Sequence, residues 1–546
     1  MADQASAGDA AARASRARGL NHRLRGVLGA ALIVMSGFVA SKLLGFVRNV
    51  VISYQYGASR EYETFIAAIS LPDMLFQILA GGAVGAAFIP VFTGYLADGS
   101  PTRAWRLTSA LITWAVLGIG VIAIAFGIAA PAVMTVLVPG WHAEDQRRAA
   151  DLARIMIASP VIFAVSALMT SVLNGTKRFA LAAMAPLMYN LSLICGALFL
   201  RHLGAEGLAI AAVVGALLHL LIQVPGLIAV GMRYTPTFGL DLDGTREVGK
   251  LMVPRMIGLG VNQVNQLINV TLASFLVAGS IAYLNYAWLI LMVPLGVFGM
   301  GISTAVFPTL AEQVERQKHS RGSEEAAERD EEASTFLFVL RIILYLTVPA
   351  AVALIVFGRP LVGLVLERGA FDATAATATA VAVMWYAIGL PGHSVIEIVD
   401  RVFYADRDTA TPVKVAAGAV ALNLTLGLVL MRTPLSYGGL ALANSLAALV
   451  EATVLSVILH RRTGWVRPRT LLAFGWRIGL AALSMAVIAM LLQGGLALHV
   501  DASATPGRAI VLLVAALLSG LSYIGVSELL GISDARRVAG LLHSRD

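Results

Sequence analysis

Long apolar segments constrain this chain more than any other feature of its sequence. A membrane-spanning helix needs roughly 20 mostly apolar residues. About fourteen segments meet this need, near residues 28–55, 63–92, 105–137, 150–174, 179–200, 206–231, 248–277, 280–310, 334–357, 374–404, 412–431, 436–459, 471–494 and 508–530. With 58% hydrophobic and 13% charged residues, the chain has more apolar surface than a water-soluble fold can bury. We therefore predict an all-α polytopic membrane protein, because lipid leaves no backbone group unpaired and the period of a β-barrel is missing.

Lysine and arginine predict the orientation of these helices. With a cytoplasmic N-terminus, 26 of the 40 Lys and Arg residues fall on the cytoplasmic side and 8 on the outer side. Such an excess is typical of cytoplasmic loops. We expect both termini inside, with cytoplasmic tails at 1–26 (disordered) and 533–546. The charged loop 313–332 is expected to be a solvated helix or hairpin.

The chain also repeats itself. Gly207–Val224 resembles Gly439–Val457 at an offset of 232 residues, and Tyr189–Asn190 is echoed by Leu422–Asn423. These echoes predict two parallel six-helix repeats, an N-lobe over 27–235 and a C-lobe over 236–462, with two extra spans over 463–532. Parallel repeats of this kind occur in secondary transporters, whose substrate sites lie between the repeats.

Cations inside the apolar segments are the main candidates for a functional site. Lys42 and Arg48 lie in the first span and Arg255 begins the seventh. A charge at mid-membrane costs roughly 2.5–3.5 kcal/mol on insertion scales, so such residues usually face a cavity or a bundle interior. Together they would form a cationic patch suited to a phosphate or pyrophosphate. The alternative is that they reach the interface or pair with Asp73 or Glu397.

Acidic residues in the later spans are candidates for ion coupling. Glu397 and Asp400 share one helix face, three residues apart, so they could bind a proton or another coupling ion. Arg401 could instead pair with Glu397 as a structural ion pair. Both interpretations stay open at this point.

Motifs of enzymes are weak in this sequence. Gly244–Lys250 has the spacing of a phosphate-binding loop, but Leu251 stands where magnesium binding needs Ser or Thr. The D-x-D at Asp241–Asp243 is interpreted as a chance match in a loop. No metal-spaced set of Cys and His is present, and the single Cys195 permits no disulfide within one chain. We expect neither a catalytic site, nor a bound metal, nor a cofactor.

Short motifs resemble one transporter family along most of residues 28–460. They begin with SKLLGFVR at Ser41–Arg48 and continue with Leu71–Pro72, Gly81–Ala83, Ala87–Phe92, Leu284–Trp288, Leu295–Gly299, Glu367–Phe371, Phe403–Ala405 and Asp408–Pro412. In this order they are similar to the lipid II flippase family (MurJ/MviN) of the multidrug/oligosaccharidyl-lipid/polysaccharide exporter superfamily. That resemblance implies two six-helix lobes plus two extra helices.

The resemblance also implies an activity. A lipid II flippase would move the undecaprenyl-pyrophosphate-linked disaccharide–peptide from the inner to the outer leaflet of the bacterial cytoplasmic (inner) membrane. A central cationic cavity would bind the pyrophosphate, and the extra helices would form a groove for the lipid tail. Alternating access driven by the membrane potential or by Na⁺ or H⁺ coupling, without ATP, is expected. The cell-wall synthesis machinery is an expected partner, and nucleic acid is not.

Residue transfer from the family is incomplete. Arg48 matches a family arginine, and Lys42 stands where the family usually has another arginine, so it loses the bidentate geometry. The family's arginine of the second span is replaced by Phe76 or Gln77, and that of the eighth by Leu289. Two expected phosphate contacts are therefore missing.

Two further family positions are altered. Glu63 stands where the family often has aspartate, and we include it with Lys42, Arg48 and Arg255 among the substrate-binding candidates. The cation site of some family members uses acids on the seventh and eleventh spans. Here Asn269, Asn423 and Gly427 align with it, and Asn423 is the residue that transfers as an ion-coupling candidate.

Three alternatives to a lipid II flippase remain. The chain could export another polyprenyl-linked glycan or an amphipathic cargo. The missing arginines also suit a transport-incompetent pseudo-flippase that serves as a scaffold. An intramembrane transferase would need a catalytic constellation that the sequence does not show.

Overall fold

The computed structural model describes residues 36–37, 39–80, 83–319, 325–466, 468–496 and 505–532. These residues form helices joined by short connections, with no strand among them, and the predicted all-α membrane fold is confirmed. The predicted tails at 1–26 and 533–546 lie outside the described residues, as do residues 320–324 of the predicted loop 313–332.

The contacts between helices divide the chain into two units. The first unit consists of the residues up to Ile52 together with Ala68–Val133 and Arg148–Leu259. The second unit consists of Ser53–Ala67, Met134–Arg147 and everything from Gly260 onward. Two short segments of the N-terminal half therefore belong to the second unit. The lobe boundaries expected from the repeat stay a prediction.

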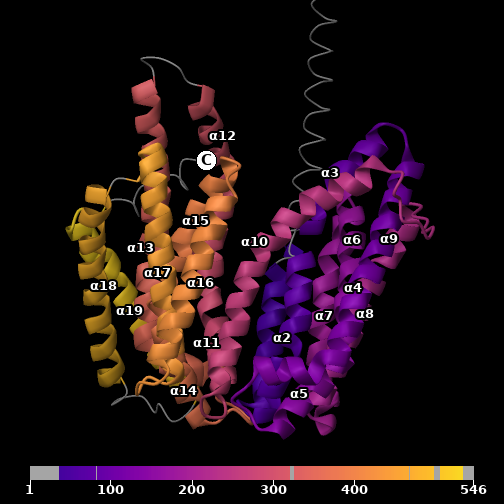
Figure 1. Ribbon diagram of the computed structural model, residues 1–546. Coiled ribbons are helices and arrows are strands. Elements are labelled where there is room, and N and C mark those ends of the chain that lie inside the picture. Colours follow the sequence, from indigo (N-terminus) through magenta and orange to yellow (C-terminus); the bar gives the residue numbers. More distant parts are fainter. Residues whose placement is uncertain are drawn as a thin grey trace, which may run out of the picture. The chain divides into compact units, whose positions relative to one another are not determined.

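Short connections join the helices of the N-terminal half, most of which are labelled in Figure 1. After a helix over residues 39–56 come α2 (Arg60–Ala80), α3 (Ala83–Ala97), α4 (Pro101–Leu137), α5 (Ala143–Ile155), the 3₁₀ turn η1 (Met156–Ala158), α6 (Ser159–Gly175), α7 (Phe179–Phe199), the 3₁₀ turn η2 (Arg201–Leu203), α8 (Ala205–Leu221), α9 (Val224–Ala229) and α10 (Asp243–Ser274). In the first unit α7 packs on α8 and α3 on α6. Small residues permit this: a Cβ on Gly215 would lie 2.8 Å from the ring of Tyr189.

The helices of the C-terminal half belong to the second unit. They are α11 (Ser280–Pro294), the π-helical η3 (Leu295–Gly301), α12 (Ile302–His319), α13 (Glu325–Val365), α14 (Ala373–Ala387), α15 (Leu390–Ala405), α16 (Ala410–Leu430), α17 (Tyr437–Thr463), α18 (Pro468–Leu496) and α19 (Thr505–Leu529). The predicted extra spans correspond to α18 and α19, which lie side by side next to α13 (Figure 1). Tyr523 donates a hydrogen bond of 2.8 Å to the carbonyl of Tyr345 there.

Ten helices in the described part of the chain are long and apolar enough to cross a membrane. An eleventh span results if α14 and α15, which are bent by 47° at their junction, count as one. Pro391 lies in the first turn of α15, where a missing N–H costs no helical hydrogen bond. The other predicted spans, 28–55, 63–92 and 248–277, contain helices with several polar residues. The count of fourteen therefore stays a prediction.

The contacts of Asp408 show what the family-like motif Asp408–Pro412 does in the structure. Its carboxylate accepts hydrogen bonds from the backbone N–H of Thr411 (3.0 Å) and from the Thr411 hydroxyl (2.6 Å) at the start of α16. Arg462, at the end of α17, adds an ion pair of 2.6 Å. Desolvation alone would raise the pKa of Asp408, but the bonds from Thr411 and Arg462 outweigh it and lower the pKa to about 2. The motif thus caps one helix and ties it to the next.

Replacing this cap should weaken the fold in a pH-dependent way. We expect Asp408→Asn to lower the free energy of unfolding by about 0.5–2 kcal/mol at neutral pH, the usual cost of losing a helix cap. Because the pKa of Asp408 is lowered in the folded state, the stability that its carboxylate contributes is complete above the ordinary carboxyl pKa. That contribution is lost as pH falls toward about 2. Thermal unfolding in detergent between about pH 7 and pH 2 measures both effects, with exposed Asp98→Asn as the control. A constant difference between the variant and the unmodified protein across that range would contradict the assignment.

Candidate functional site

Arg48 is held in the first unit by an amide on α7. Its Nη1 donates to Oδ1 of Asn190 at 3.0 Å, and its Nη2 donates to Oδ1 of Asn49 at 3.2 Å. Asn190 is itself buried, and its Nδ2 donates to the carbonyl of Pro186 at 3.0 Å and to that of Ser41 at 3.4 Å. The buried amide therefore fixes both the helix over 39–56 and the guanidinium it carries.

The charge of Arg48 remains available to an anion. Its hydrogen-bond partners in the described part of the chain are neutral amides, and the side chain is half-buried. Asp73 on α2 lies within electrostatic range of it. Charge-assisted hydrogen bonds from arginine to phosphate are roughly twice as strong as neutral ones. This geometry suits recognition of a phosphate group.

The other predicted cations are only partly placed. Lys42 is exposed on the same helix, six residues before Arg48 and about 120° around it. Arg255 lies on α10, but its side chain is outside the described residues. The cationic patch of Lys42, Arg48 and Arg255 therefore stays a prediction.

An apolar contact replaces the family's arginine on the second span. The ring of Phe76 lies 4.3 Å, centroid to centroid, from that of Phe163 on α6. Both rings line a small cavity that also includes Asp73. At the corresponding place on α11, Leu289 is half-buried. These positions contribute packing in this chain and no positive charge.

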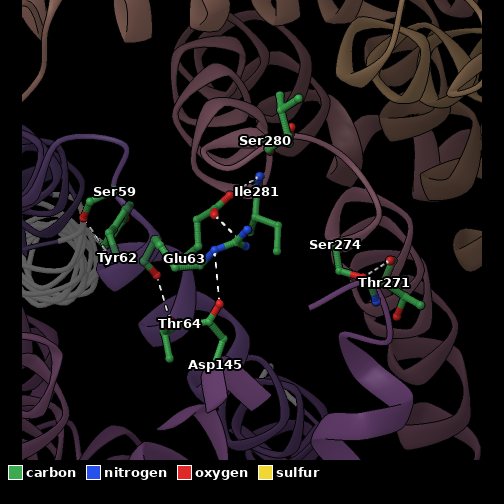
Figure 2. A network of polar contacts seen from close by, with 12 residues as sticks. Ser59, Tyr62, Glu63, Thr64, Asp145, Thr271, Ser274, Ser280 and Ile281 are labelled. Carbon is green, nitrogen blue, oxygen red and sulfur yellow. Dashed lines mark hydrogen bonds and ion pairs between the residues drawn. The ribbon is translucent and has the colours of Figure 1, made fainter. Parts of the chain in front are cut away.

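Glu63 lies in a polar network of the second unit (Figure 2). The residue is only 1% exposed, and its Oε1 accepts a hydrogen bond of 2.8 Å from the backbone N–H of Ile281. That N–H is one of those left unpaired at the beginning of α11, so the carboxylate caps the helix. Its Oε2 forms an ion pair of 3.0 Å with Arg60. Because both oxygens are engaged and buried, this geometry favours a structural role over contact with an anionic substrate.

Arg60 extends the network to a second segment of the N-terminal half. Its Nε lies 3.6 Å from Oδ2 of Asp145, and its guanidinium covers the ring of Trp141 at 4.7 Å. Nearby, the backbone N–H of Gly140 donates to Oγ of Ser274 at 3.3 Å. The segments 53–67 and 134–147 are therefore attached to the region where α10 ends and α11 begins.

Two glycines bring the turn after the first helix against the loop after α13. Gly57 and Gly369 both have a φ of 60°, which favours glycine. A Cβ on Gly57 would collide with the carbonyl of Ala370, and one on Gly369 with that of Tyr54. The backbone N–H of Ala370 donates to Tyr54 O at 2.8 Å. This close approach explains the glycine in the motif Glu367–Phe371.

The acidic side chains on α15 lie in a cluster inside the second unit. Glu397 is 3.6 Å from Arg401, which also donates to the hydroxyl of Thr304 at 2.9 Å. Asp400 lies within electrostatic range of Glu397, Arg401 and, from α17, Glu451. Its Oδ1 is buried and has no hydrogen-bond partner among the described residues. The predicted ion pair of Glu397 with Arg401 is present, and a role of Asp400 in ion coupling stays a prediction.

Asn423 belongs to a cluster of amides. Its Nδ2 donates to Oδ1 of Asn265 at 2.7 Å and to Oδ1 of Asn269 at 3.2 Å, both on α10. The residue is 2% exposed, and its own Oδ1 has no partner among the described residues. Gly427 lets α16 come close to Leu272, which also lies on α10. At the positions aligned with the family's cation site, this chain thus has two amides and a glycine in place of carboxylates.

Comparisons with known proteins now settle the family. The sequence model described as "Lipid II flippase MurJ" matches residues 52–509. The chain belongs to the lipid II flippase MurJ family. Its members include the probable lipid II flippase MurJ of Haemophilus influenzae, 30% identical over 459 residues that cover 82% of this chain and 88% of that protein. The lipid II flippase MurJ of Burkholderia cenocepacia is 31% identical over 457 residues, covering 80% and 86%. The resemblance inferred from the motifs is confirmed.

Solved structures agree on the fold. A lipid II flippase MurJ in an inward closed conformation matches with a TM-score of 0.75 at 22% identity, covering 91% of this chain and 98% of that one. An inward-facing multidrug resistance MATE family transporter of the MOP superfamily matches with a TM-score of 0.64 at 15% identity, covering 78% and 94%. The MurJ family member described here thus shares its architecture with membrane transporters.

Several residues of these networks carry little signal in the sequence. Asn190 and Asn265 carry no charge and match no motif, and the attachment of Arg60 to Asp145 joins distant segments. A signal for the amides existed: Asn190 and Asn423 occupy the same place in the two repeats. That echo indicates a repeat, but by itself it does not show which groups each amide contacts.

The hydrogen bond and the ion pair of Glu63 should contribute to the stability of the fold. We expect Glu63→Ala to lower the free energy of unfolding by about 3 kcal/mol or more, because it removes a buried acceptor and leaves Arg60 and the N–H of Ile281 without it. Glu63→Gln keeps an oxygen for Ile281 and should cost clearly less. Thermal unfolding of the purified variants in detergent measures both. Equal losses in the two variants would show that the hydrogen bond to α11 contributes little.

Proposed function

We propose that this chain moves lipid II from the inner to the outer leaflet of the bacterial cytoplasmic membrane. The observation that carries the proposal is Arg48, a half-buried cation held by neutral amides. A pyrophosphate group would supply the anionic partner that this guanidinium lacks among its hydrogen-bond partners. Membership of the lipid II flippase MurJ family supports the same substrate.

The mechanism proposed is alternating access in a secondary-type transporter, with no catalytic step. Arg48 would hold the pyrophosphate in the first unit while the headgroup crosses. The segments 53–67 and 134–147 are attached to one another through Arg60 and Asp145 in the second unit, where they would move together. Motions of such packed segments are hinge or shear movements. The tail of lipid II would lie along α18 and α19.

The orientation and partners complete this proposal. Both termini would be cytoplasmic, following the distribution of lysine and arginine. The substrate would be delivered on the inner face, and the cell-wall synthesis machinery would use it on the outer face.

For the coupling ion we propose H⁺ rather than Na⁺. Asn269, Asn423 and Gly427 align with the family's acidic cation site, and Asn423 contacts the neutral amides of Asn265 and Asn269. The described side chains there lack the negative charge that favours a metal cation. The cluster on α15 and α17 offers a carboxyl group in Asp400 whose Oδ1 has no hydrogen-bond partner among the described residues. Intramembrane acids of this kind serve as proton carriers in transporters.

This choice of ion can be tested in proteoliposomes with a fluorescent lipid II analogue. We expect transport to be unchanged when Na⁺ is replaced by K⁺, and to respond to an imposed pH gradient. Asp400→Asn should abolish the response to the gradient, while Glu397→Gln should keep part of it because Glu397 is already paired with Arg401. A strict requirement for Na⁺ would overturn the proposal.

Complementation tests the transport proposal itself. Cells depleted of their own lipid II flippase should grow when they express this chain and should lyse when they express Arg48→Glu at equal level. Arg48→Lys should support reduced growth, because it keeps the charge but loses the bidentate geometry. Arg432→Glu, a charge reversal at an exposed connection, is the matched control and should be tolerated.

The outcomes separate the rival functions. Failure of the well-expressed unmodified chain, together with transport of another polyprenyl-linked glycan in vesicles, would assign it a different cargo. Growth that is insensitive to Arg48→Glu would favour the pseudo-flippase scaffold. Either result would leave the fold unaffected.

A further inference from the structure

The connection between α9 and α10 is attached to the side of α4. Trp114 donates through Nε1 to the carbonyl of Phe238 at 3.0 Å, and the two rings meet edge to face with centroids 5.4 Å apart. The backbone N–H of Thr235 donates to Oγ of Ser109 at 3.2 Å. Arg106 forms an ion pair of 2.9 Å with Asp241. These contacts hold the connection as a strap across α4, within the first unit.

A cavity lies beneath this strap. Its volume is about 670 Å³, and its walls come from α3, α4, α6, the strap and the first half of α10. This volume is within the range of about 300–1,000 Å³ that is usual for small-molecule sites. The lining is apolar, with Ile122, Leu168, Leu240 and Met256 among its residues, and Arg246 is the charged member.

Two glycines keep the cavity open. Gly118 on α4 and Gly249 on α10 both line it, and a Cβ at either position would meet no atom within 4 Å. Neither glycine has a positive φ, so the backbone does not require it there. Both glycines are exposed in the cavity wall, so a longer side chain at either position would extend into the cavity.

The polarity of the cavity changes along its length. Arg246 lies in the first turns of α10 and lines the cavity together with Trp114, an exposed aromatic residue of the kind that is typical of the membrane interface. Met256 lines the cavity ten residues further along the helix, about 15 Å away at 1.5 Å per residue. The occupant should therefore be anionic at one end and apolar over about this length.

We propose that the cavity binds a membrane glycerophospholipid, with one acyl chain between α4 and α10 and the phosphate at Arg246. Charge favours this occupant, because Arg106 is neutralised by Asp241 while Arg246 has no ion-pair partner among the described residues. The lining is apolar and exposed at Trp114, Ile122 and Leu240, as a surface facing lipid would be. The bound chain would act as a wedge that holds the strap in place.

A photoreactive lipid tests the proposal directly. The full-length protein is placed in nanodiscs that contain phosphatidylglycerol with a diazirine at the end of one acyl chain. After irradiation, the crosslinked residues are located by mass spectrometry. We expect crosslinks in residues 118–122 and 252–256, the apolar end of the cavity. The double variant Gly118→Leu with Gly249→Leu should reduce this yield at least fivefold because its side chains fill the space.

Gly120→Leu is the matched control. Gly120 lies on the same helix, also has no neighbour within 4 Å of its Cβ, and does not line the cavity. Its crosslinking should be unchanged. Arg246 is exposed, so Arg246→Gln does not disturb packing. In this variant, unlabelled phosphatidylglycerol should lose some of its advantage over an uncharged diacylglycerol as a competitor of the photoreactive lipid. This second variant keeps the test decisive if the double variant does not fold.

Three results would overturn the proposal. One is a crosslink pattern that avoids the two predicted segments. Another is a yield that the double variant leaves unchanged at normal folding. The third is competition by undecaprenyl phosphate but not by phosphatidylglycerol, which would assign the cavity to a polyprenyl chain. None of these results depends on whether the chain transports lipid II.

Discussion

Buried amides hold the helix over 39–56 and α10 in this membrane protein. Asn190 binds the carbonyl of Ser41 and the guanidinium of Arg48, and Asn423 binds Asn265 and Asn269 on α10. In a bilayer, burial of an unpaired polar group costs several kcal/mol, so such side chains keep to one arrangement of the helices. The position of Arg48 in the proposed substrate site depends on this arrangement, because the same amide fixes both the helix and its charge.

The two amides occupy equivalent places but contact different chemistry. In the first repeat the amide supports a cation, and in the second it supports two further amides. The expected repeats thus share a buried asparagine at these positions, whereas the groups that it contacts differ.

The sequence predicted the helical class and most helix positions because long apolar segments have few alternatives in lipid. It also singled out Arg48 as a candidate site residue, since a charge in such a segment needs an explanation. It did not predict that Glu63 caps α11 or that Arg60 reaches Asp145, because these contacts join residues far apart in the chain. It predicted an arginine-poor site but not the Phe76–Phe163 contact that replaces the missing charge.

The backbone contact between Gly57 and Ala370, and between Gly369 and Tyr54, has a consequence for evolution. Side-chain contacts can be strengthened or weakened in small steps by exchanging one residue for a slightly different one. Bare backbone offers no such gradation, since any Cβ at Gly57 or Gly369 collides with a carbonyl. This contact is either made completely or not at all. Any graded change in the strength of this contact must therefore come from the residues around it.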